Sequence, residues 1–130
     1  MNDRDRHPRV TAADRQALGR RGEALAADFL SQHRGMTILD RNWHCHLGEL
    51  DLVARAGNTV VFCEVKTRRG EGFGAPVEAV GVAKQLRLRR LAGAWLAAHD
   101  ERADVVRIDV IGIVWPDGGR ARLSHLVGVC

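Results

Sequence analysis

The sequence predicts an α/β domain with a mixed five-stranded sheet flanked by two main helices, in the order αβββαββ. Apolar residues recur with helical spacing over residues 11–33. Polar and apolar residues then alternate over residues 48–55, and an apolar segment follows at 59–66. A second helical segment at 77–99 separates this apolar segment from another at 105–114. Because a helix usually connects parallel strands by a right-handed crossover, the last two segments are expected to be parallel neighbours.

The first helix is predicted to begin after Thr11, a favourable N-cap residue, and to extend to about His33. Gly35 follows as a stop signal. Inside the helix, Gly19 and Gly22 are poor helix formers that cost about 1 kcal/mol each relative to alanine. We expect both glycines to let another part of the chain, or a ligand, come close.

A strand at 36–42 and a hairpin come next. The hairpin turns at residues 56–58, and its apolar second strand, 59–66, is expected to lie centrally in the sheet. Its first strand is expected to alternate strictly between two faces. One face would carry Glu49, Asp51 and Val53, and the other Leu50, Leu52 and Ala54. A last strand is predicted at 120–127, after a turn that contains Pro116.

Length and composition indicate one domain over residues 11–130, preceded by a disordered basic tail at 1–10. The chain has 130 residues, 45% of them hydrophobic, and no apolar run reaches the roughly 18 residues of a membrane helix. Its three cysteines form no CxxC pair, which favours a reducing cytoplasm over an oxidising compartment. Membrane and secreted proteins are therefore not expected.

Positive charge is concentrated between Lys66 and Arg90, where seven cations accompany two acids. A basic segment of this kind suits a polyanionic partner, because cations that contact phosphates release condensed counterions. The segment predicts a nucleic-acid partner; the alternative is a solvated helix face that serves solubility. The predicted nucleic-acid-binding residues are Arg68, Arg69, Lys84, Arg87, Arg89 and Arg90.

Several charged residues fall on strands that ought to be buried. Glu64 and Lys66 share one face of the apolar strand, and the hairpin should bring Asp51 opposite Glu64. Buried charges cost several kcal/mol unless they are paired or bind a metal. A structural ion pair would explain two of them. Mg²⁺ or Mn²⁺ held by Asp51 and Glu64, with Lys66 orienting a water molecule, would explain all three and suits phosphodiester hydrolysis.

Asp51 followed by Glu64-x-Lys66 matches the PD-(D/E)xK nuclease pattern, with Leu50 at the position of the proline. A longer ordered set resembles the YraN family of bacterial proteins, predicted endonucleases similar to archaeal Holliday-junction resolvases. The matching segments are Gly22-Glu23, Arg41-Asn42-Trp43, Gly48-Glu49-Leu50-Asp51-Leu52, Phe62-Cys63-Glu64-Val65-Lys66-Thr67-Arg68 and Phe73-Gly74-x-Pro76. The resemblance implies a restriction-endonuclease-like fold and a metal-dependent nuclease acting on DNA, with branched or damaged DNA as candidate substrates. It implies catalytic roles for Asp51, Glu64 and Lys66, and points to Glu23 as an additional carboxylate.

The remaining candidates depend on helical spacing and chemistry. Glu23 and Glu49 are further candidate metal ligands, and each has solvation as its alternative. Gln85 falls on the core-facing side of the second helix and is a candidate catalytic residue; a polar residue extending to solvent at a helix end is the alternative. His125 is expected at the surface.

Two hypotheses for function remain open at this point. The first is a nuclease, for which resolvase-like action would call for a homodimer with two active sites. The second is a non-catalytic module on the same fold that binds nucleic acid or recruits a protein. The intact Asp51, Glu64 and Lys66 set favours the enzyme.

Overall fold

A computed structural model describes residues 11–70 and 81–129. Its element order confirms the predicted αβββαββ arrangement. The elements are α1 (Ala12–Arg34), β1 (Thr37–Cys45), β2 (Gly48–Ala56), β3 (Thr59–Arg68), α2 (Val82–His99), β4 (Val105–Val114) and β5 (Arg122–Leu126). The expected tail at 1–10 and the expected start of the second helix at residue 77 lie outside the described residues.

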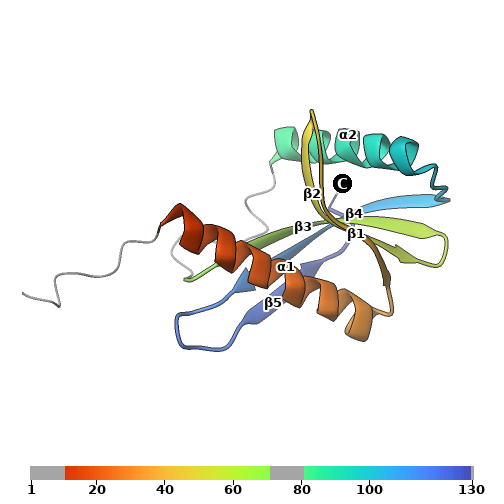
Figure 1. Ribbon diagram of the computed structural model, residues 1–130. Helices are drawn as coiled ribbons and strands as arrows, with labels where there is room; N and C mark the ends of the chain where they lie inside the picture. The colour runs from red at the N-terminus through yellow and green to blue at the C-terminus, as the bar shows by residue number, and fades with distance from the viewer. Residues whose placement is uncertain (1–10, 71–80, 130) are drawn as a thin grey trace, which may run out of the picture.

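The five strands form one sheet in the order β1-β2-β3-β4-β5. Only β3 and β4 are parallel, and α2 lies in the connection between them, as the crossover rule predicts. Helices α1 and α2 cover opposite faces of the sheet (Figure 1). The apolar strand β3 is therefore central and covered on both sides.

Each helix closes a separate apolar core against the sheet. The α1 side includes Ala26, Ala27, Leu30, Leu52, Ala54, Val61, Cys63, Ile111 and Ile113. The α2 side includes Leu50, Val53, Val60, Phe62, Leu88, Leu91, Ala92, Trp95 and Ile108. Leu88, Leu91 and Trp95 follow helical spacing, so that one face of α2 is buried.

The strict alternation expected for β2 is wrong at one point. Leu50 packs on the α2 side, whereas Leu52 and Ala54 pack on the α1 side. The paired register between β2 and β3 ends at Leu52 and Cys63. The switch of faces therefore falls at Asp51, next to the end of the paired segment.

Helix α1 begins with a capping box, in which Thr11 and Asp14 bond each other's backbone N–H groups, and ends at Gly35 with a positive φ of 65°. Gly22 allows a close approach to β3, because a Cβ at this position would lie 1.8 Å from Oγ1 of Thr67. At Gly19 no other part of the described chain comes close, since a Cβ there would meet no other atom of the described residues within 4 Å, and the close approach of a ligand stays a prediction. Of the two glycines, Gly22 is the one that sets how closely α1 packs on the sheet.

Asp109 of β4 is a fully buried acid on the α1 side of the sheet. Nε and Nη2 of Arg107 donate to its carboxylate over 2.9 and 3.0 Å, and the backbone N–H of Gly128 donates over 3.0 Å. Nε2 of His125 lies 2.7 Å from Oδ2, and the His125 side chain is 1% exposed. The expectation of a surface histidine is therefore wrong, because β5 turns this ring inward onto Asp109.

The helices of the described residues include none that is both long and apolar enough to cross a membrane.

Candidate active site beside the central strand

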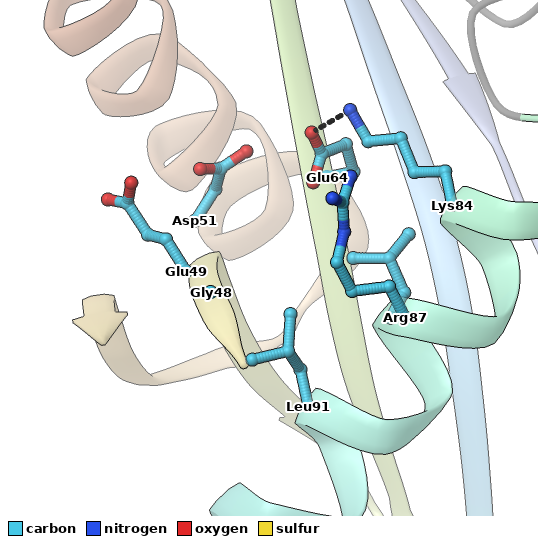
Figure 2. Close-up of a pocket in the computed structure, with 8 residues that line it drawn as sticks. Gly48, Glu49, Asp51, Glu64, Lys84, Arg87 and Leu91 are labelled. Carbon is cyan, nitrogen blue, oxygen red and sulfur yellow. Dashed lines mark ion pairs between the residues drawn. The ribbon is translucent and has the colours of Figure 1, made fainter. Parts of the chain in front are cut away.

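A pocket of about 230 Å³ opens between β2, β3 and the first turns of α2. Figure 2 shows carboxylates on one side of this pocket and cations on the other. Its lining residues are Gly48, Glu49, Asp51, Glu64, Lys84, Arg87, Leu88 and Leu91. The pocket therefore brings the predicted acids of the hairpin together with part of the predicted basic surface.

Asp51 projects from β2 at the point where the pairing with β3 has ended. Its Oδ2 accepts a hydrogen bond from the backbone N–H of Val65 over 2.8 Å, so the side chain contacts β3 in place of a further backbone pair. Burial raises the pKa of Asp51 to about 8, and the negative charge of Glu64 adds to this effect. The bond from Val65 opposes the shift, whereas the charges of Glu23 and Glu49 reinforce it with smaller effects than that of Glu64.

Glu64 lies on β3 two residues after Phe62, on the face that α2 covers. Nζ of Lys84 lies 2.8 Å from Oε1 of Glu64. Lys84 is one helical turn before the buried Leu88, and this spacing directs it to the same face of α2 and so towards the sheet. The helical spacing predicted that Lys84 would face the core, but no pattern in the sequence indicated Glu64 as its partner.

Glu23 and Glu49 are held by a residue that carries no predicted role, Asn42. Nδ2 of Asn42 donates to Oε1 of Glu23 over 2.8 Å and to Oε1 of Glu49 over 3.2 Å. Asn42 has a φ of 51°, a left-handed conformation that asparagine tolerates better than most residues. The local signal for this residue was an asparagine inside a strand, a position that asparagine rarely occupies.

Lys66 and Gln85 are both half-buried. Neither is among the described residues that line the pocket. Lys66 leaves β3 on the same face as Glu64, and its side chain forms no hydrogen bond or ion pair with another described residue. Its ammonium group is therefore not committed to a structural partner within the described parts of the chain.

The predicted nucleic-acid-binding arginines fall into two groups. Arg87, Arg89 and Arg90 are exposed on α2, and Arg87 also lines the pocket. Arg68 and Arg69 lie at the end of β3, where Arg69 approaches Asp117 with an Nη1–Oδ1 distance of 3.9 Å. Of these described arginines, Arg87 adjoins the carboxylates, whereas Arg89 lines a separate pocket beside β4.

Comparison with known proteins is decisive for the family. The sequence model of the uncharacterised protein family UPF0102 matches residues 22–113. The chain belongs to the UPF0102 family. This confirms the family that the motifs predicted under the name YraN.

Relatives in this family cover nearly all of the chain. A UPF0102 protein of Clavibacter michiganensis is 51% identical over 115 residues, which are 88% of this chain and 97% of the relative. A UPF0102 protein of Nocardia farcinica is 52% identical over 116 residues, or 89% of this chain and 91% of the relative. A third, of Acidothermus cellulolyticus, is 56% identical over 80% of this chain and 86% of the relative.

The donor set of this UPF0102 protein fits a hard divalent cation that keeps much of its water. Within residues 11–70 and 81–129, no group of three or more His, Cys, Asp or Glu side chains is arranged to hold a metal ion. Glu23 and Glu49, the further candidate ligands, each accept a hydrogen bond from Asn42. Asp51 and Glu64 remain as a neighbouring pair, and Mg²⁺ is commonly bound by one or two carboxylates together with waters and substrate phosphates.

Proposed function

We propose that this protein is a nuclease that hydrolyses phosphodiester bonds in DNA with the help of Mg²⁺ or Mn²⁺. The observation that carries the proposal is the setting of Asp51. Its carboxylate is sheltered beside Glu64, near two further acids, and is ion-paired to no cation among the described residues. A folded protein keeps such a destabilising arrangement where function requires it.

In this proposal Asp51 and Glu64 hold the metal ion. When bound, the ion polarises the scissile phosphate and lowers the pKa of a coordinated water molecule. The backbone N–H of Val65 fixes one oxygen of Asp51, so the carboxylate is already oriented before it binds anything. Glu23 and Glu49 surround the pair, and the Asn42 amide positions both of them.

Lys66 is proposed to orient the attacking water and to stabilise the charge that builds up on the phosphate oxygens. Its position on the same strand face as Glu64, without a partner among the described residues, supports this role. A compact ammonium group can approach a water and one phosphate oxygen together, where a planar guanidinium is larger and more rigid.

DNA is the proposed polyanion because α2 carries three exposed arginines, of which Arg87 lines the pocket. Arg89 and Arg90 are exposed elsewhere on the same helix, Arg89 beside Val106 and Ile108 of β4. Contacts of this type bind the sugar-phosphate backbone and do not read sequence. Branched DNA is the candidate substrate that the family resemblance implies, and resolvase-like action on it would call for a homodimer with two active sites.

The decisive experiment incubates the purified protein with branched, single-stranded and duplex DNA in the presence of Mg²⁺ or Mn²⁺. We expect cleavage by the wild type, none by Asp51→Asn, and a loss of about 100-fold or more in Lys66→Arg, as is typical when one positioned electrostatic group is removed. Gel-shift measurements on the same variants should show DNA binding close to wild type. Binding without cleavage on every substrate would instead favour the non-catalytic module.

A further inference from the structure

Lys84 already occupies the pocket as a counter-ion. Nζ of Lys84 lies 2.8 Å from Oε1 of Glu64, and the two side chains are 24% and 14% exposed. In Figure 2 the ammonium group reaches Glu64 from α2, on the side of the carboxylate opposite Asp51. This ion pair is shielded from water, so it is stronger than an exposed surface pair.

The ion pair uses an oxygen that the proposed metal site also needs. An ammonium group and a divalent cation at the same carboxylate repel each other, and this repulsion is stronger in a sheltered pocket than in bulk water. Glu64 can therefore hold either Lys84 closely or the metal ion closely. The ammonium group, at the end of a flexible stem of four methylenes, is the partner that can move away.

A released Lys84 would still be in a useful place. Arg87, three residues further along α2, lines the same pocket, so both cations project to one side of the helix. An incoming phosphate would take the place of Glu64 as the anion beside Lys84. Metal binding releases Lys84 from Glu64, and a bound phosphate stabilises the released ammonium group. Metal binding and phosphate binding would therefore favour each other.

Resting on the metal-dependent activity proposed above, we propose that Lys84 is a built-in counter-ion of Glu64 that the metal ion displaces and that then binds the substrate phosphate. The ion pair orients Glu64 while the site is without metal. It also lowers the affinity for metal in the absence of substrate, which restrains cleavage until DNA is present.

Calorimetric titration with Mn²⁺ in the absence of DNA tests this proposal on three proteins. Lys84→Met keeps most of the length of the side chain and removes the charge that competes with the metal. Arg87→Met is the matched control, because it removes a positive charge from the same pocket without breaking the ion pair with Glu64. We expect Lys84→Met to bind Mn²⁺ at least about tenfold more tightly than the wild type, within the usual range of coupling between sites. Arg87→Met should differ by no more than about threefold, the scatter expected of a single exposed charge.

The results separate this proposal from the one on which it rests. Equal affinities in the wild type and Lys84→Met, both abolished by Asp51→Asn, would overturn the counter-ion role and leave the metal site intact. Mn²⁺ binding that survives Asp51→Asn, or none in any of these proteins, would overturn the metal site and the counter-ion role together.

Chemical labelling of lysines in the wild type gives a second measurement that does not depend on how Lys84→Met folds. Acylation of Lys84, quantified by peptide mass spectrometry, should become faster when Mn²⁺ is added, and should not change in Asp51→Asn. An unchanged rate in the wild type at saturating Mn²⁺ would also overturn the proposal.

Discussion

Two aspartates on neighbouring parts of the same sheet have opposite surroundings. Asp109 accepts hydrogen bonds from Arg107, His125 and the backbone of Gly128, whereas Asp51 accepts one from the backbone of Val65. Burial acts to raise the pKa of both carboxyl groups. The hydrogen bonds of Asp109 outweigh this effect and hold its pKa below the ordinary value, whereas burial, reinforced by the charge of Glu64, raises the pKa of Asp51 to about 8.

The difference shows that a buried charge alone does not identify an active site. Asp109 is completely buried, but its carboxylate is hydrogen-bonded by Arg107, His125 and Gly128. Its role is therefore structural. Asp51 is less buried, but it lies among Glu64, Glu23 and Glu49 with no cation of its own among the described residues. The absence of a cationic partner for Asp51 among the described residues distinguishes it as a candidate functional residue.

The largest expected effect comes from Asp109→Asn. The change keeps the shape of the side chain but removes the charge that Arg107 and His125 require. We expect the free energy of unfolding to fall by about 3–5 kcal/mol, the usual result of removing one partner of a buried ion pair. Urea unfolding near neutral pH measures it, and a loss well under about 1 kcal/mol would contradict the structural role assigned to Asp109.

The same substitution at the other aspartate should have the opposite sign. Asp51→Asn removes a charge that its neighbours disfavour, and the asparagine carbonyl can still accept the hydrogen bond from Val65. In a metal-free buffer above pH 8, we expect the free energy of unfolding to rise by about 1–2 kcal/mol. A destabilisation similar to that of Asp109→Asn would remove the distinction between the two sites.

The two acids should also give stability opposite dependences on pH. Folding raises the pKa of Asp51 from 3.8 to about 8, so the folded state keeps a proton that the unfolded chain has already lost. Its contribution to stability is full below pH 4 and is lost as the pH rises towards 8, with a slope of at most about 1.4 kcal/mol per pH unit. Subtracting the profile of Asp51→Asn from that of the wild type isolates this slope, and a flat difference would contradict it.

Asp109 should behave in the reverse way under acid. Its pKa is lowered by folding, so its contribution is present above the unfolded value of 3.8 and is lost as the pH falls below it. The loss of stability in acid should therefore come from the protonation of Asp109. Asp51 does not contribute to it, because Asp51 already carries a proton at that pH. Comparison with Asp109→Asn over the same acid range measures this contribution.

The smallest expected effects are changes in the pKa of Asp51 when the neighbouring acids are substituted. Glu64→Gln and Glu23→Gln should each lower the pKa of Asp51, and Glu64→Gln should lower it more, because the charge of Glu64 is the larger influence. NMR titration of the Asp51 carboxyl carbon measures both shifts. Asp28→Asn, an exposed acid of α1, is the control and should leave the titration unchanged.

Sequence patterns were sufficient for the fold because each element has a strong local signal. The capping residues and apolar spacing marked α1, and the continuous apolar segment marked β3 as the central strand. The hairpin turn fixed the register, and the register placed Asp51 beside Glu64. The break in alternation at Asp51 was not predictable, because it depends on where β2 separates from β3.

The parts of the site that escaped prediction depend on contacts between distant segments. Asn42 bonds Glu23 and Glu49 across three elements, and Lys84 reaches Glu64 from a helix 20 positions later in the chain. His125 is one polar residue on a short strand, and only the position of β5 turns it inward. No periodicity in the sequence carries such information, since each contact is a property of the assembled sheet.

The source of the one hydrogen bond that Asp51 receives has an evolutionary consequence. It comes from the backbone of Val65, so every residue at that position except proline can supply it, and mutations on β3 leave it intact. Asp109 relies on the side chains of Arg107 and His125, and a change at any of these three positions leaves the others unsatisfied. Over many generations, positions 107, 109 and 125 should therefore change together, whereas the orientation of Asp51 tolerates variation around it.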